Sequence, residues 1–153
     1  MPLPPAVPSN RPYARGGWLF PRPVIEIFLI GPRSRQSVAA VVDPGGECCL
    51  FPEWLGWRAG YRQSPASSVL TVGSSVSQTG VPACFETVKL ELADPAGVQP
   101  PFRWTAAVGF TPRGSFARMS AFGVLGVNGG LAHFQRVEFV WSALAGPEVV
   151  LRT

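Results

Sequence analysis

Asp43 is the residue whose position best suits chemistry. The apolar segment 37–42 runs directly into it, and Pro44, Gly45 and Gly46 follow. A tight turn of this composition can hold a carboxylate at the end of a strand against backbone N–H groups, where it could act as a general acid or base. The same residues also suit an ordinary surface turn, with Asp at the first position, Pro fixing φ and Gly accepting positive φ.

A second carboxylate for such chemistry is hard to find within one chain. Amide hydrolysis by aspartates uses two carboxylates that share a proton, because close like charges force their pKa values apart. The only other aspartate, Asp94, lies in an Ala-Asp-Pro-Ala-Gly sequence with no apolar strand before it, so we expect a turn there. A catalytic pair therefore requires a homodimer in which each chain contributes Asp43 across a two-fold axis.

Other catalytic constellations are poorly supported. His133 is the only histidine, which argues against a serine triad and nearly excludes a metal site. The adjacent Cys48 and Cys49 precede apolar residues and are expected to be buried and inert. The glycine-rich segment 126–130 lacks the Lys-Ser/Thr of a phosphate loop. We therefore expect no metal and no cofactor.

Composition indicates an all-β fold. The 153 residues contain 17 glycines and 17 prolines, which disfavour long helices, so we expect mostly β structure with one or two short helices. The net charge of +4 comes from dispersed arginines and does not indicate nucleic-acid binding. Segment 24–30 contains Glu26 and is too short to span a membrane. Residues 1–10 do not resemble a secretory signal, and three cysteines form no disulfide framework, so we expect a cytoplasmic location.

Three regions are expected along the chain. Residues 1–22 are rich in proline and are interpreted as a flexible N-terminal arm, 23–145 as the folded domain, and 146–153 as a C-terminal tail. Within the domain, strands are expected at 23–31, 37–42, 48–51, 69–72, 81–92, 102–110, 121–126 and 136–141, and short helical turns at 52–57 and 131–134. Trp54, Leu55 and Trp57 are expected to be core residues.

The order of these motifs resembles the retropepsin-like aspartic peptidases, particularly the small single-domain bacterial ones. The matching pieces are the strand–Asp–x–Gly turn at 41–46 with the segment 50–52, and the apolar–apolar–Gly segment 124–126 with Asn128-Gly129 and the short helix expected at 131–134. The hairpin 69–92 falls where that family has its flap. The resemblance covers roughly residues 23–140 and implies a closed acid-protease barrel with a flap hairpin.

The resemblance also implies roles for individual residues. Asp43 would be the catalytic aspartate, and the residues supporting its loop would be Pro44, Gly45, Gly46, Val124, Leu125 and Gly126. The flap closing over the substrate would be Gly73, Ser74, Ser75, Val76, Ser77, Gln78, Thr79 and Gly80. A peptide or protein substrate would bind extended, as an added strand held by main-chain hydrogen bonds.

Pro44 departs from the family pattern. The family has Thr or Ser after the aspartate, and that hydroxyl hydrogen-bonds across the dimer to brace the two catalytic loops; proline has neither a hydroxyl nor an N–H. Gly46 replaces a small residue such as Ala. Three interpretations follow: a homodimeric aspartic endopeptidase, a retropepsin-like domain that lost activity through Pro44 and serves as a peptide-binding or dimerisation module, or an unrelated β-barrel in which 43–46 is only a turn.

Overall fold

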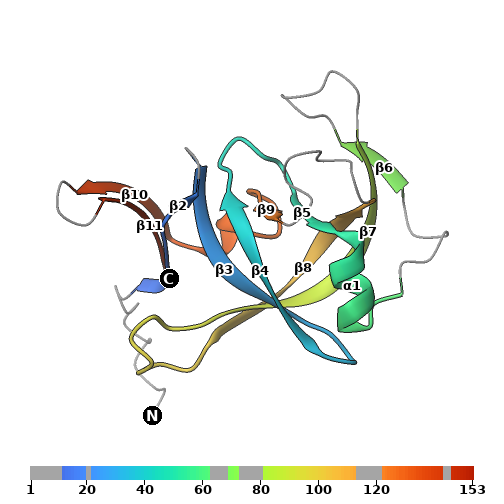
Figure 1. Ribbon diagram of the computed structural model, residues 1–153, viewed down its shortest axis with the longest axis horizontal. Helices are drawn as coiled ribbons and strands as arrows, with labels where there is room; N and C mark the ends of the chain where they lie inside the picture. The colour runs from blue at the N-terminus through green and yellow to red at the C-terminus, as the bar shows by residue number, and fades with distance from the viewer. Residues whose placement is uncertain (1–11, 20–21, 63–68, 73–80, 113–121, 143–145) are drawn as a thin grey trace, which may run out of the picture.

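The computed structural model describes residues 12–19, 22–62, 69–72, 81–112, 122–142 and 146–153 (Figure 1). The strands are β1 Pro12–Gly16, β2 Trp18–Leu19, β3 Arg22–Ile30, β4 Arg35–Val42, β5 Cys49–Pro52, β6 Val69–Val72, β7 Val81–Leu92, β8 Phe102–Thr111, β9 Gly123–Leu125, β10 Arg136–Ser142 and β11 Gly146–Arg152. Between them lie the α-helix α1, Glu53–Ala59, and the 3₁₀ turn η1, Leu131–His133.

Six strands close into a barrel. Their order is β3-β4-β9-β5-β8-β7, and β7 returns to pair with β3. The closing pairing is antiparallel and joins Phe28 to Glu91 and Ile30 to Lys89. Closure leaves both edges of the sheet paired at this point, which removes the template for edge-to-edge association. The predicted fold class, mostly β with a short helix and a closed barrel, is confirmed.

The barrel interior follows from the alternation of apolar residues along each strand. In β3, Ile25, Ile27 and Leu29 are buried, whereas Glu26 between them is exposed. Successive side chains of a strand point to opposite faces, so a period of two places one apolar set inside. Each such side chain contributes about 1.5–3 kcal/mol through burial. The same pattern supplies the inward sets of β4, β7 and β8, which include Val38, Ala40, Val42, Val88, Leu90, Leu92, Trp104, Ala106 and Val108.

Helix α1 covers part of the barrel with a narrow apolar face. Leu55 and Ala59 are one turn apart and fully buried, and Gly60 ends the helix in the left-handed region with φ of 97°. Trp54 is half-buried against the core. The expectation that Trp57 is a core residue is wrong, since its side chain is 53% exposed. It follows Leu55 by two positions, which turns it to the opposite side of the helix.

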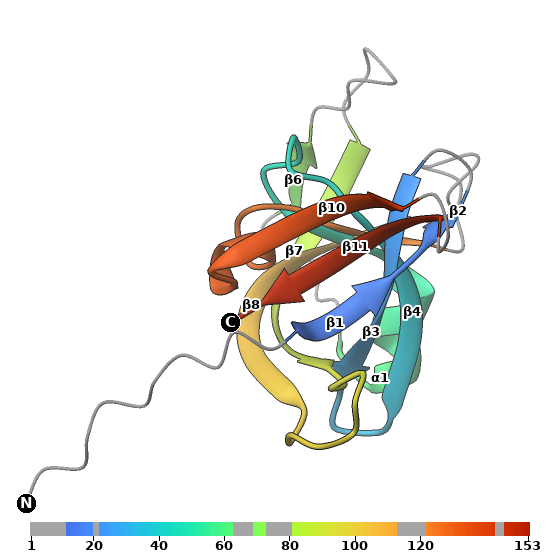
Figure 2. The same ribbon diagram turned by 90° about the vertical axis from the view of Figure 1, so that its left-hand side faces the viewer.

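A second sheet of three strands, in the order β1-β11-β10, lies across the barrel (Figure 2). Its central strand, β11, buries Val149, Val150 and Leu151. The structure therefore differs from the expected arm at 1–22 and tail at 146–153, because β1 and β11 pair with each other. β11 pairs with β10, the strand before it, and on its other side with β1, so β1 is a strand through a partner that is distant in sequence. Residues 1–11 lie outside the described residues.

The β6–β7 hairpin is present as expected. The two strands pair antiparallel from Val69 with Cys84 to Val72 with Val81. Residues 73–80, which connect them, lie outside the described residues.

Glu91 is buried where the alternation along β7 predicts an exposed acid. Its side chain is 2% exposed and lies between Arg35 of β4 and Arg103 of β8: Arg35 Nη2 is 2.6 Å from Oε1, and Arg103 Nε is 2.6 Å from Oε2. The Arg35 guanidinium also lies 3.3 Å from the centre of the Phe28 ring. Burial opposes ionisation of Glu91, but the hydrogen bonds and charges of the two arginines outweigh it, so its pKa is lowered.

Replacing Glu91 by Gln should destabilise the fold by about 2 kcal/mol at pH 7, because two arginines lose the charge that they face. A lowered pKa in the folded state adds stability above the ordinary carboxyl range, and this stability is lost as pH falls through the lowered value. Urea denaturation from pH 7 downwards measures both effects, and the acid dependence should be weaker in the variant. Glu47→Gln, which removes an exposed acid, is the control. Equal losses of unfolding free energy in Glu91→Gln and Glu47→Gln would contradict the stabilising role of the Glu91 ion pairs.

Candidate functional site

Asp43 lies where β4 leaves the barrel. β4 runs parallel to β9, with Val41 opposite Val124 and Val42 opposite Leu125 (Figure 1). The backbone N–H of Asp43 continues this pairing by donating to the Leu125 carbonyl at 3.1 Å. The last residues of β4 are buried, whereas Asp43 is half-buried. The strand therefore delivers the carboxylate to the surface on a backbone fixed by its neighbour.

The loop after β4 folds back on the aspartate. The Gly45 N–H donates to Asp43 Oδ1 at 3.0 Å, and the Gly46 N–H donates to the Asp43 carbonyl at 3.1 Å. Among the described residues, Oδ2 accepts no hydrogen bond. A Cβ at Gly46 would lie 3.2 Å from Oδ2, so the absence of a side chain there keeps that oxygen uncrowded. One carboxylate oxygen is thus held and the other is available to a water or a substrate.

The backbone of Gly126 packs directly against the backbone of this loop. A Cβ there would lie 2.3 Å from the Cys48 carbonyl oxygen and 2.8 Å from that of Gly46, so only glycine fits without a backbone shift. The two backbones are also hydrogen-bonded: the Val127 N–H donates to the Gly46 carbonyl at 2.8 Å, and the Asn128 N–H to that of Glu47 at 2.8 Å. The structure therefore brings Leu125 and Gly126 against the aspartate loop.

Val124 has a different place from its two neighbours. It pairs with Val41 on one side and with Leu50 on the other, so it joins β4 to β5 through β9. Its side chain is half-buried.

Asn128, which belongs to the matching motif, contacts the loop, and so does Val127, which the sequence did not single out. The glycines at 126, 129 and 130 are the sequence feature that indicates a tight turn at these residues. Gly129 takes a positive φ of 80° and lets the chain turn back into η1. The Leu131 N–H then donates to the Gly126 carbonyl at 2.9 Å. This turn fixes the strand end on which the aspartate loop rests.

The two cysteines behind the loop are unsuited to nucleophilic chemistry. Cys49 is fully buried, with Sγ 3.6 Å from the Asn128 carbonyl oxygen. Burial raises its pKa to about 12, and the charge of Cys48 adds to this, although a hydrogen bond to the Gly126 backbone opposes them. Burial and the nearby Glu47 carboxylate also raise the pKa of Cys48. Both thiols stay protonated at neutral pH.

Asp94 is a turn residue, as expected. Its Oδ1 accepts the Ala96 N–H at 3.0 Å, and its Oδ2 accepts the N–H groups of Val98 and Gln99 at 3.0 and 2.7 Å. The turn lies in the β7–β8 connection, at the opposite end of the barrel from the β4 terminus (Figure 1). Asp94 is thus unavailable as a partner for Asp43 within one chain.

The remaining predicted residues are distributed as follows. Pro44 is exposed on the outside of the aspartate loop. The flap residues 73–80 lie outside the described residues, although the strands that flank them are present. His133 is exposed, and its ring lies 5.8 Å from that of Trp104.

Two further findings bear on the kind of site. In the part of the chain that the structure describes, no three His, Cys, Asp or Glu side chains gather so as to hold a metal ion. The helices described there are too short or too polar to cross a membrane.

Comparison with known proteins finds a distant resemblance among solved structures and none at the level of sequence. No family model and no curated protein matches the sequence. Among solved structures, the chain is similar to a crystal structure of a retropepsin-like aspartic protease from Rickettsia conorii. The identity is 11%, the TM-score is 0.49, and the similarity covers 90% of this chain and 89% of the other.

Substituting Gly126 by Ala should destabilise the protein by about 3 kcal/mol, because the added methyl group meets two backbone carbonyls that cannot move independently. Gly45→Ala is the matched control, since its Cβ would approach only Asp43 Oδ1, at 3.4 Å. Chemical denaturation monitored by tryptophan fluorescence compares the two. A Gly126→Ala protein as stable as Gly45→Ala would show that the two backbones are not in close contact.

Proposed function

We propose that this chain is a retropepsin-like aspartic endopeptidase that acts as a homodimer, with Asp43 as the catalytic residue of each subunit. The observation that carries the proposal is the Asp43 loop. At the end of β4 the Asp43 N–H donates to the Leu125 carbonyl, which fixes the backbone there. The Asp43 Oδ1 accepts a hydrogen bond from the Gly45 N–H, and among the described residues Oδ2 accepts none. Such an oxygen is oriented in advance for proton transfer.

In the proposed reaction, two Asp43 carboxylates from two subunits hold one water and share one proton. The ionised carboxylate takes a proton from the water as it attacks the peptide carbonyl, and the protonated carboxyl group donates its proton to the carbonyl oxygen. Collapse of the tetrahedral intermediate then breaks the C–N bond, with a proton passing to the leaving amine. The Gly45 N–H keeps each carboxylate in position throughout.

The homodimer follows from the number of carboxylates. Asp94 is fully engaged in its own turn, so a second catalytic carboxylate has to come from a second chain. Strand β10 offers a surface for self-association: within the described residues its outer edge pairs with no strand, and Trp141 on it is 69% exposed. Unpaired edges with large apolar side chains are templates for pairing with another chain.

The proposed substrate is an extended peptide or protein segment, bound beneath the residue 73–80 hairpin tip as an added strand. No nucleic acid, membrane or cofactor takes part. The proposed location is the cytoplasm, since Cys48, Cys49 and Cys84 are all free thiols, which suits a reducing compartment.

Pro44 supports a second candidate, a retropepsin-like domain that binds peptides or dimerises without cleaving. An exposed proline in the aspartate loop can neither donate from its backbone nor supply a hydroxyl to brace a second loop. In that case each subunit keeps the loop geometry around Asp43, but the aspartate loops of two subunits no longer brace each other.

Asp43→Asn should abolish peptide cleavage while leaving stability and oligomeric state unchanged, because the amide keeps the shape of the carboxylate and loses its proton chemistry. The measurement is cleavage of a peptide library at acidic pH, with inhibition by pepstatin as a further criterion. Glu47→Gln, an exposed acid in the same loop, is the matched control and should retain activity. Undiminished cleavage by Asp43→Asn would exclude Asp43 as the catalytic group.

Absence of cleavage in the wild type would favour the second candidate. Pro44→Thr then separates the two candidates, since restoring the hydroxyl should restore cleavage if bracing of the loops is the missing element.

A further inference from the structure

The outer surface of the barrel is basic where the barrel closes. Strands β4, β3, β7 and β8 are neighbours there, and directly paired residues of neighbouring strands lie on the same face of a sheet. The register places one row of residues across the four strands: Arg35, Ile30, Lys89 and Thr105. The next row consists of Ser37, Phe28, Glu91 and Arg103. The three cations of these rows, Arg35, Lys89 and Arg103, are exposed, and we call them the basic face.

Glu91 holds two of these cations in place. Arg35 lies over the Phe28 ring and donates to Glu91 Oε1 through Nε at 2.9 Å and through Nη2 at 2.6 Å. Arg103, from the strand on the other side of β7, donates to Oε2 through Nε at 2.6 Å. Among the described residues, Arg35 Nη1 and both Nη groups of Arg103 have no acceptor, and these side chains are 48% and 61% exposed. The outward N–H groups are therefore fixed in advance, which lowers the entropic cost of binding an anion.

The charges on this face do not balance. Two acids face outward from the four strands in the described residues, and Glu91 offsets one of the three positive charges. The other acid, Glu26, accepts a hydrogen bond from Ser37 Oγ at 2.5 Å, on the far side of Phe28 from Lys89. Lys89 Nζ forms no ion pair with any residue that the structure describes. The face therefore keeps a net positive charge.

Two further arginines extend the positive charge toward α1. Arg33, in the β3–β4 turn, is exposed, and its backbone N–H donates to the Ala59 carbonyl at the end of the helix at 2.9 Å. Arg62, which follows the helix, is exposed as well. Tyr61 connects this segment to the basic face, because its hydroxyl accepts the Lys89 backbone N–H at 3.1 Å. The positive charge thus continues past the edge of the sheet.

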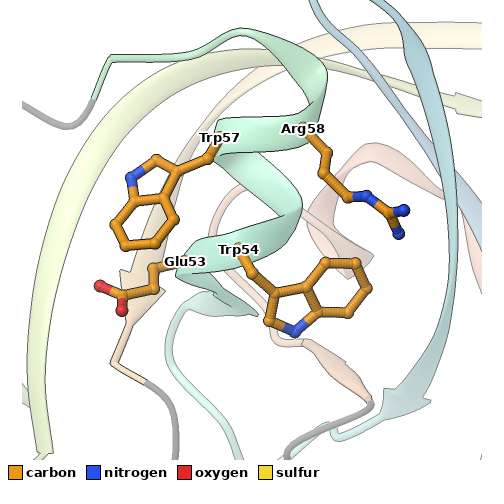
Figure 3. A pocket seen from close by; sticks show the side chains of 4 residues that line it. All are labelled: Glu53, Trp54, Trp57 and Arg58. Carbon is orange, nitrogen blue, oxygen red and sulfur yellow. The ribbon is translucent and has the colours of Figure 1, made fainter.

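The hollow on the outside of α1 does not belong to this surface. It measures about 420 Å³ and is lined by Glu53, Trp54, Trp57 and Arg58. Figure 3 shows the two indoles on opposite sides of the helix, so they form no joint platform. The Arg58 guanidinium faces the Trp54 ring, 5.7 Å from its centre, and Arg58 is therefore not counted with the basic face.

The counter-charge for the basic face has to come from another molecule. The chain has nine acidic residues, and all of them lie in the described ranges, at positions 26, 43, 47, 53, 86, 91, 94, 138 and 148. The segments outside those ranges therefore contain no side-chain carboxylate that could cover this face.

The chemistry of the face favours carboxylates carried by a protein. A planar guanidinium matches a carboxylate through parallel N–H groups. Nucleic-acid binders neutralise about six to ten phosphates along the backbone, more than this face can contact. Membrane-surface binding uses exposed apolar side chains beside the cations, and the large exposed ones in the described residues lie on other elements: Trp57, Val98, Val127 and Trp141.

We propose that the basic face is a docking site for an acidic segment of a partner protein. The site is separate from the aspartate loop. Arg35 begins β4 and Asp43 follows its end, so the eight residues of the strand separate them by about 25 Å. A segment docked at the basic face leaves the Asp43 carboxylate accessible, and the proposal does not depend on peptidase activity.

The test measures binding of a fluorescent peptide of alternating glutamate and serine to the full-length chain by anisotropy. The peptide should bind, and its affinity should fall as salt is added, because surface charges are screened. Lys89→Gln should weaken binding about threefold, and Arg103→Gln about tenfold. Arg136→Gln on β10, where the side chain is 64% exposed, removes the same charge elsewhere and should leave the affinity unchanged.

The controls separate docking at this face from general attraction to a basic protein. The same peptide with glutamine in place of glutamate should not bind. If Arg103→Gln fails to fold, Lys89→Gln decides, because no bond of the Lys89 side chain to the described residues is lost. Unchanged affinity in Lys89→Gln, or an equal loss in Arg136→Gln, would overturn the proposal. Tighter binding of a single-stranded oligonucleotide or of phosphatidylserine vesicles, weakened by Lys89→Gln, would assign the face to a phosphate-bearing partner and would also overturn it.

Discussion

The close passage of two backbones at Gly126 is the constraint on which the candidate site depends. Strand β9 lies between β4 and β5, so the loop that joins these two strands has to pass over the end of β9. It does so with the carbonyls of Gly46 and Cys48 nearly touching the Gly126 Cα hydrogens. Hydrogen bonds from Val127 and Asn128 then fix the loop in register. This crossing also sets the position of the Asp43 carboxylate, because the Asp43 backbone N–H donates to the carbonyl of Leu125, the residue before Gly126.

The rest of the barrel keeps that crossing rigid. The β3–β7 pairing closes the ring, and the buried Glu91 carboxylate joins Arg35 and Arg103 near that closure. The three-stranded β1-β11-β10 sheet then covers one side of the barrel. Because the barrel interior is densely packed, the strands beneath the loop cannot shift independently of one another. Residues as distant in sequence as Glu91 and Gly126 therefore contribute to one arrangement.

Much of this structure could be predicted from local sequence. The apolar segments 23–31, 37–42 and 48–51 and the glycines around 126 predicted barrel strands and placed Asp43 at a strand end. Non-local pairing could not be read in this way: β1 is a strand because β11, at the other end of the sequence, supplies its hydrogen bonds. Trp57 was misplaced because its type suggests the core while its angular position on α1 points outward. The burial of Glu91 could not be predicted from local sequence, because its partners Arg35 and Arg103 lie on two other strands. The close contact at Gly126 likewise appears only once β9 is inserted between its neighbours.

The central claim, that catalysis needs one Asp43 from each of two chains, is tested most directly by mixing. Wild-type protein at constant concentration is equilibrated with increasing amounts of Asp43→Asn protein, and the rate of peptide cleavage is measured. With a paired site, random exchange of subunits makes the rate per wild-type chain fall in proportion to the wild-type fraction, to about half at equal amounts. A rate that stays constant as the variant is added would mean that one Asp43 suffices, and would contradict the paired-carboxylate account.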